Sequence, residues 1–123
     1  MDREKLLKKI DTFNDELINM RRHIHAHPEL SGLENQTAIL ISGYLKNIGW
    51  RVTESVGRTG VVAEFGPIDK GFIGLRVDMD ALPIYENTNL SFSSKIDGVM
   101  HACGHDIHTC IGLGVAKIIK ELK

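Results

Sequence analysis

An apolar run that ends in two aspartates is the feature that most constrains how this chain can fold. Residues 71–77 read GFIGLRV, and Asp78, Met79 and Asp80 follow directly. A strand that is apolar at almost every position is typical of a mixed sheet with both faces covered. Open α/β sheets bind their ligands at the carboxyl ends of strands. The run therefore predicts a strand over 71–77, with both aspartates at a binding edge.

The rest of the chain alternates between helical and strand-like patterns. Apolar residues at helical spacing predict one continuous helix from about residue 6 to 24, ended by Pro28. A second helix is predicted from about Glu34 to Ile48, capped at Gly49, and a third from about Asp106. Short runs at 51–54 and 60–65 predict two more strands, and 86–98 is expected to be loop. This order predicts an α/β fold with helices packed on a mixed sheet.

Size and charge exclude several classes of protein. A chain of 123 residues corresponds to one domain, spanning 1–123. Lys and Arg total 15 and Asp and Glu total 16, so no basic excess is available for a nucleic acid or an anionic membrane. No apolar block has the length of a signal peptide or a membrane span, and two cysteines are too few for a disulfide-rich secreted fold. We therefore expect a cytoplasmic protein with no nucleic-acid or membrane partner.

The densest group of reactive side chains is HACGHDIH, at residues 101–108. In an extended segment, Cys103 and His105 project to the same side and can face one ion, while Gly104 lets the backbone bend close to it. Thiolate and imidazole suit zinc, and a nearby carboxylate also tolerates manganese or cobalt. Cys103 and His105 are therefore the candidate metal ligands. The alternative is a thiol acting as a small apolar side chain beside surface histidines.

Asp78 and Asp80 form a second candidate group. Two carboxylates at a strand end can bind a cation, or can hold a ligand imidazole through a hydrogen bond. Alternatively, they only terminate the strand. By contrast, Cys110 lies on the apolar side of the last predicted helix and is expected in the core.

The histidines near the end of the first predicted helix are a weaker case for a metal site. His23, His25 and His27 are two positions apart, and on a helix such positions lie about 200° round the axis. They cannot share an ion unless the helix has already ended. We expect a solvated helix end there, with Arg21 and Arg22 on a charged face.

Three blocks of the sequence resemble one enzyme family. RRHIHAHPELSGLENQTA, LRVDMDALPIYE and GVMHACGHDIHTC occur in this order. They are similar to the amino-terminal part of the di-metal amidohydrolases and peptidases, a family that includes bacterial aminoacylases, hippurate hydrolases, N-acetyldiaminopimelate deacetylases and auxin-conjugate hydrolases. The resemblance covers nearly the whole chain from about His23.

The resemblance implies a catalytic α/β domain that binds two metal ions, a smaller inserted lid domain, and cleavage of the amide between an acyl group and an amino acid. Carried onto this chain, Cys103 and His105 match the first two metal ligands. Asp80 matches the carboxylate beside the metal site and is the candidate catalytic residue. Asp78 stands where wider relatives have a ligand histidine, so its role stays open.

Family members continue with two adjacent glutamates, two more ligand histidines and the lid, none of which occurs within these 123 residues. We therefore expect a lid-less, amino-terminal part of a zinc- or manganese-dependent enzyme for N-acyl amino acids or peptides, inactive alone. An uncovered sheet would favour self-association into a homo-oligomer. The alternative is a non-catalytic metal-binding or interaction module. A structural zinc module fits less well, because closed sites take four protein ligands.

Overall fold

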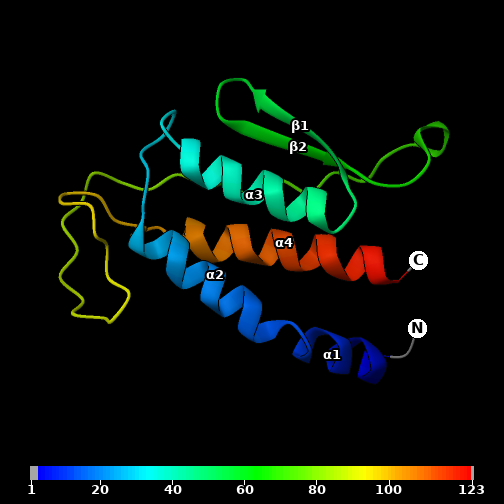
Figure 1. Cartoon of the computed structure of the whole chain (residues 1–123), viewed down its shortest axis with the longest axis horizontal. Helices are drawn as coiled ribbons and strands as arrows, with labels where there is room; N and C mark the ends of the chain where they lie inside the picture. Colours follow the sequence, from blue (N-terminus) through cyan, green and yellow to red (C-terminus); the bar gives the residue numbers. More distant parts are fainter. Residues whose placement is uncertain (1–2, 123) are drawn as a thin grey trace.

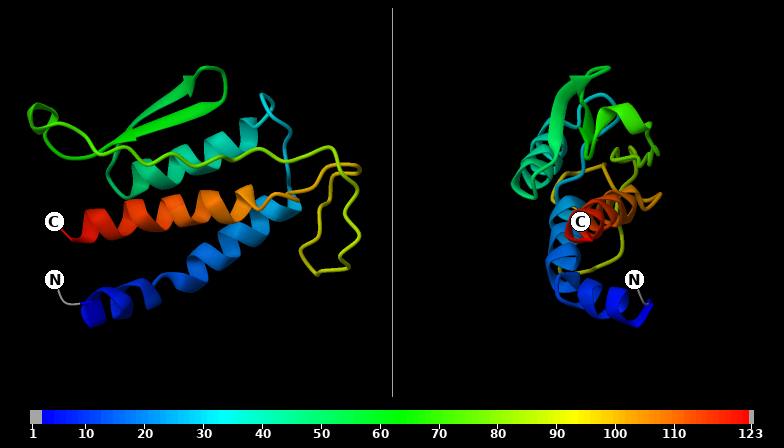
Figure 2. Two further views of the ribbon diagram at one scale, coloured as in Figure 1. Left: turned by 180° about the vertical axis from the view of Figure 1, so that it is seen from behind. Right: turned by 90° about the vertical axis from the view of Figure 1, so that its right-hand side faces the viewer.

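The computed structural model describes residues 3–122 of the chain. Within that range, helices α2, α4 and α3 lie side by side, and a β-hairpin covers the outer side of α3 (Figure 1). A long irregular connection after the hairpin runs back along the molecule and forms a loop at the end opposite the termini (Figure 2). The elements are α1 Arg3–Asp11, α2 Asn14–Ala26, α3 Asn35–Asn47, β1 Arg51–Val56, β2 Gly60–Glu64, the 3-10 helix η1 Ile68–Lys70, and α4 His105–Glu121.

The core lies where α3, α4 and the hairpin meet. Its buried centre combines Ile41 and Leu45 of α3 with Leu113 and Ala116 of α4. These pairs are four and three residues apart, so each helix turns one apolar face inward. Side chains from α2 and from both strands pack around this centre. The helix α3 over 35–47, both hairpin strands and the start of α4 agree with the sequence predictions.

Helix α3 ends as its sequence predicts. Gly49 has a φ of +84°, and its N–H donates to the Lys46 carbonyl at 2.9 Å. The N–H of Trp50 donates to the Leu45 carbonyl at 3.0 Å. A left-handed glycine at this position satisfies the last helical carbonyls and turns the chain into β1.

The single amino-terminal helix predicted over 6–24 is wrong, because the helix is broken between α1 and α2. The N–H groups of Thr12 and Phe13 donate three residues back, to the carbonyls of Lys9 and Ile10, at 3.2 and 3.1 Å. This tighter turn brings the Phe13 side chain inward, where it is only 4% exposed. Burial of one aromatic ring at the junction therefore interrupts an otherwise regular apolar pattern.

The predicted strand over 71–77 is also wrong. Residues 71–80 have no regular structure and pair with neither described strand, so the described sheet is a two-stranded antiparallel hairpin and not a mixed sheet. Ile73 is fully exposed, and Phe72 and Leu75 are more than half exposed. An apolar run becomes a strand only when a neighbouring backbone accepts its hydrogen bonds, and none is present in the described part of the chain.

The same segment closes one side of an apolar cavity of about 550 Å³. The opposite walls come from α3, α4 and β2, and the side chain of Val77 lies against Gly112 of α4.

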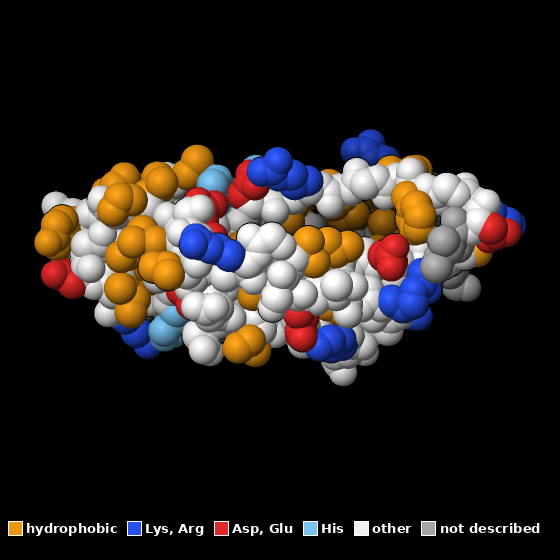
Figure 3. All heavy atoms as spheres, turned by 90° about the horizontal axis from the view of Figure 1, so that it is seen from above, with side chains coloured by type: hydrophobic (Ala, Val, Ile, Leu, Met, Phe, Trp, Pro, Cys, Tyr) orange, Lys and Arg blue, Asp and Glu red, His pale blue; other side chains and the backbone are white. Residues whose placement is uncertain are grey.

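Hydrophobic side chains also gather at the end of the molecule that carries the 82–98 loop (Figure 3). That loop contains no helix or strand, as predicted for residues 86–98. Among the described helices, none combines the length and apolar character of a membrane span.

Candidate metal centre

His105 begins helix α4 and is held by Asp80. Gly104, with a φ of +85°, turns the chain into the helix. The His105 ring then lies with Nδ1 at 2.9 Å from Asp80 Oδ1 and 3.0 Å from the Asp80 carbonyl oxygen. Both oxygens are acceptors, so Nδ1 carries the proton and donates, which leaves the lone pair on Nε2 available to a metal. The structure thus brings together two of the predicted site residues.

Asp78 and His108 complete a group of three potential ligands with His105. One ligand atom from each residue lies within 4.8 Å of the others. His105 and His108 are three positions apart on α4, and their rings stack at 5.9 Å with 10° between planes. The Thr109 hydroxyl donates to the Asp78 carbonyl at 3.2 Å, which fixes this part of the chain against α4. One carboxylate and two imidazoles fit zinc or manganese.

The predicted ligand Cys103 is an exposed free thiol in the turn before α4 and is not a member of that group. Its metal-binding role stays a prediction. Cys110 is buried in the core, as predicted, and burial raises the pKa of its thiol to about 12. The two thiols therefore differ sharply in access, and burial disfavours the thiolate form of Cys110.

A polar cavity of about 460 Å³ adjoins the candidate ligands. Its walls include Asp78, Asp80 and His105 on one side and Glu34 with Thr59 on the other. Glu34 is 5% exposed and accepts a hydrogen bond from the Thr59 hydroxyl at 2.6 Å. Three carboxylates line this opening, and Arg76, which also lines it, pairs with one of them, Asp78, at 3.1 Å. The remaining negative charge favours a cation there.

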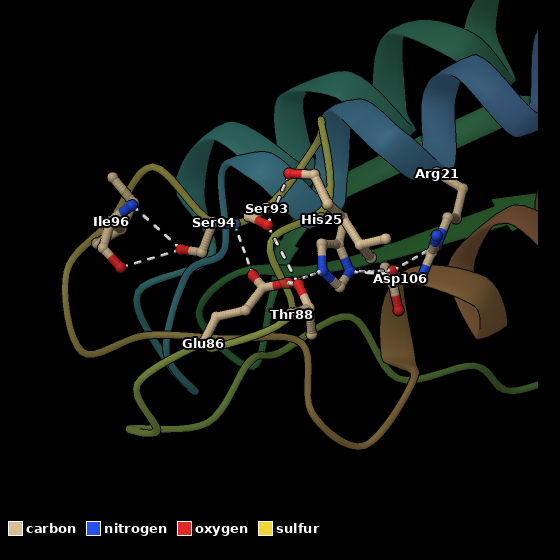
Figure 4. A network of polar contacts seen from close by, with 9 residues as sticks. Arg21, His25, Glu86, Thr88, Ser93, Ser94, Ile96 and Asp106 are labelled. Atoms are coloured by element: carbon tan, nitrogen blue, oxygen red, sulfur yellow. Dashed lines mark hydrogen bonds and ion pairs between the residues drawn. The ribbon is translucent and has the colours of Figure 1, made fainter.

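A second polar cluster surrounds His25, which is only 3% exposed (Figure 4). His25 Nδ1 lies 2.8 Å from Asp106 Oδ2, and Nε2 lies 3.0 Å from Glu86 Oε1. Arg21 Nε donates to the same Asp106 oxygen at 2.7 Å. Asp106 is completely buried. The cluster joins α2, the first turn of α4 and the start of the 82–98 loop.

The solvated helix end that the sequence predicted is therefore wrong for His25. Its helix turn packs against α4 and the loop, and Arg21 serves as a donor to a buried carboxylate instead of lying on a free charged face. His23 is exposed, as expected, and stacks on His27 at 4.5 Å. The only sequence signal for the cluster is that Arg21 and His25 are four positions apart on one helix face.

Glu86 and His101 have strongly perturbed environments beside His25. Burial favours the protonated form of Glu86, but hydrogen bonds from Thr88, the Ser94 N–H and His25 outweigh it and lower its pKa to about 2. His101 is 4% exposed, and both its ring nitrogens lack a hydrogen-bond partner among the described residues. Burial lowers the pKa of His101. Its ring lies 6.4 Å from that of His25.

Comparison with known proteins shows which family this chain resembles. The sequence profile of Peptidase family M20/M25/M40 matches residues 74–123, which include both aspartates and the HACGHDIH run. The YXEP protein of Bacillus subtilis, described as a dinuclear metal-binding peptidase of the M20 family, has the same fold over 91% of this chain. The TM-score is 0.81 and the sequences are 44% identical. The chain belongs to the M20 peptidase and amidohydrolase family.

Two curated M20 relatives differ in the activity that they are named for. The N-acyl-L-amino acid amidohydrolase of Geobacillus stearothermophilus is 42% identical over the whole of this chain, which covers 34% of that protein. Thermostable carboxypeptidase 1 of Saccharolobus solfataricus is 45% identical over 98% of the chain, which covers 31% of that protein. The chain thus spans about a third of the length of these relatives.

Proposed function

We propose that this chain is the metal-binding amino-terminal part of an M20 amidohydrolase that hydrolyses N-acyl amino acids. One observation carries the proposal: Asp80 engages Nδ1 of His105, a predicted ligand, and His105 groups with Asp78 and His108 as three potential ligands. The identity to an N-acyl-L-amino acid amidohydrolase along the whole chain supports the substrate class. The identity to a carboxypeptidase extends that class to peptides.

In this proposal, Cys103 and His105 hold an ion, with Asp78 and His108 as the further ligands that the geometry offers. A bound zinc or manganese ion would act as a Lewis acid toward the amide carbonyl of the substrate. Asp80 keeps the proton on Nδ1 of His105, and so fixes the ring orientation and makes Nε2 a stronger donor to the ion. Glu34, across the cavity, adds negative charge without contacting the ligand histidine.

The general base that the family resemblance implies is a glutamate of an adjacent pair, and the 123 residues contain no such pair. The residues described here can orient a metal ligand but have no assigned group for activating water. The chain alone, loaded with Zn²⁺ or Mn²⁺, is therefore expected to release no amino acid from N-acetylated amino acids. Release that disappears in His105→Ala would show that the base lies within this chain.

Cobalt(II) substitution tests the ligand set directly, because a thiolate ligand gives a charge-transfer band that imidazole and carboxylate do not. We expect the wild-type chain to show this band on Co²⁺ titration. Cys103→Ser should lose the band and keep weak binding, whereas His105→Ala should lose most of the affinity. Cys110→Ser is the matched control, since it removes the buried thiol and should leave the titration unchanged.

The same titration separates the two candidate ligand sets. If Asp78→Asn and His108→Ala weaken Co²⁺ binding while Cys103→Ser changes nothing, then the ion sits in the three-residue group and Cys103 is not a ligand. If none of these variants changes the isotherm of the wild-type chain, or if wild type binds no Co²⁺, the metal proposal is wrong.

A further inference from the structure

The first turn of α4 lacks the local cap that normally fixes a helix start. Gly104 occupies the N-cap position and offers no side-chain hydrogen bond to the free N–H groups that follow. Asp106 stands in the first turn, but its carboxylate accepts hydrogen bonds from Arg21 and His25 of α2, more than eighty residues earlier. The placement of this turn therefore depends on α2.

Two donors from α2 meet on one oxygen of Asp106. Arg21 Nε lies at 2.7 Å and His25 Nδ1 at 2.8 Å from Oδ2, and Asp106 is fully buried. A buried carboxylate costs several kcal/mol unless charged or hydrogen-bonding partners compensate it, so the turn cannot rotate away from Arg21 and His25 without a large penalty. Figure 4 shows both side chains reaching Asp106 from the same face of α2.

Asp106 is the immediate neighbour of His105. Successive residues of a helix project about 100° apart, so a fixed direction for Asp106 also fixes the direction of His105. That direction places His105 Nδ1 at 2.9 Å from Asp80 Oδ1. Within the described residues, Arg21 and His25 form no hydrogen bond with Asp80 or His105, so they act on the ligand through Asp106.

We infer that Arg21 and His25 are positioning residues for the metal centre: by gripping Asp106 they hold the first turn of α4 so that His105 presents Nε2 to the ion. The inference rests on the proposed function, because the proposed ion is what Nε2 of His105 would face. His25 also bonds Glu86, so one side chain couples the 82–98 loop to the same turn. Neither residue belongs to the ligand set.

The test compares the wild-type 123-residue chain with two double variants by NMR of ¹⁵N-labelled histidine rings without metal. Wild type is expected to show His105 as the single tautomer protonated at Nδ1. In the double variant Arg21→Met/His25→Phe, Asp106 loses both donors, and His105 should become a mixture of tautomers. The matched control is Arg22→Met/His23→Phe, two exposed neighbours on the same helix, which should match wild type.

The second readout is Co²⁺ affinity. Removing a group that orients a metal ligand typically weakens binding by about 10- to 100-fold, so we expect a loss of at least tenfold in the double variant and none in the control.

If the double variant does not fold, the single variants Arg21→Met and His25→Phe each keep one donor to Asp106 and should shift the His105 signals part of the way. His25→Asn keeps an N–H donor near the position of Nδ1, which faces Asp106, and should restore the wild-type tautomer.

Failure of this inference is distinguishable from failure of the proposed function. An unchanged His105 tautomer in a folded Arg21→Met/His25→Phe chain overturns the positioning role, whatever the chain binds. The opposite outcome is also clear. If the wild-type chain binds no Co²⁺ but the double variant still changes the His105 tautomer, the metal proposal is overturned and the positioning role is supported. An equal change in the Arg22→Met/His23→Phe control also overturns the inference.

Discussion

Glu86 is held in its ionised form by donors from the loop and from His25. Its pKa is lowered from 4.5 to about 2, so the stability that it contributes is complete above pH 4.5, the unfolded value, and is lost as the pH falls toward 2. We predict that Glu86→Gln lowers the free energy of unfolding by about 1–2 kcal/mol at pH 7, allowing for solvent screening of the shift. Urea unfolding at several pH values measures this.

The difference between wild type and Glu86→Gln should shrink between pH 4.5 and 2. Asp97→Asn, an exposed change in the same loop, should leave the pH dependence as in wild type. Parallel stability curves for wild type and Glu86→Gln over this range would contradict the assignment.

The two cysteines should react at very different rates. The Cys103 thiol is exposed, whereas Cys110 is 6% exposed and burial raises its pKa to about 12, which removes the reactive thiolate. We predict one iodoacetamide adduct per native chain, two after denaturation, and none in native Cys103→Ser. Intact-mass measurement counts the adducts, and two adducts formed at similar rates in the native chain would refute the burial of Cys110.

Residue-level prediction from sequence anticipated that the aspartates and the cysteine–histidine run meet, and the metal-binding role of these residues stays a prediction. The acidic pair after an apolar run pointed to a site near HACGHDIH, and Asp80 does meet His105. It failed for His25, because the partners of this residue, Glu86 and Asp106, are 61 and 81 positions away. No periodicity in the sequence records a contact over such a separation.

At the scale of elements, replacing a glycine by alanine is predicted to have opposite effects on stability at two positions, one within α3 and one just after it. Gly49 has a φ of +84°, and an added Cβ would lie 3.0 Å from Lys120 Nζ, so Gly49→Ala should destabilise by about 1 kcal/mol. Gly43 lies within α3 in open space, so Gly43→Ala should stabilise by about 0.5–1 kcal/mol through helix propensity. Urea unfolding of both variants checks this, and a stabilising Gly49→Ala would contradict the cap.

Helices and strands could be predicted where the residues that form and end them lie close together in the sequence. Helix α3 carries its apolar face and its terminating glycine within 15 residues, from Asn35 to Gly49. The α1–α2 break was not predictable, because Phe13 fits a continuous helical pattern equally well until its burial against α4 is known. The strand over 71–77 was wrong for a related reason: a strand needs a pairing partner, and without one this apolar run stays exposed.

At the scale of the whole molecule, the unpaired apolar segment 71–77 should drive self-association. Exposed apolar side chains with unpaired backbone groups favour contact with another chain. We predict concentration-dependent association in sedimentation velocity, reduced by Ile73→Lys at the fully exposed position. Ile39→Lys, at an exposed site of α3, is the matched control and should associate like wild type. A monomer at all concentrations would contradict this prediction.

The dependence of the α4 turn on α2 also bears on biosynthesis. Arg21 and His25 leave the ribosome long before Asp106 does, so neither can contact its carboxylate partner while most of the chain is being translated. Until then, a nascent chain has neither the anchored turn nor an oriented His105. The proposed metal site can therefore form only after α4 has been made and docked.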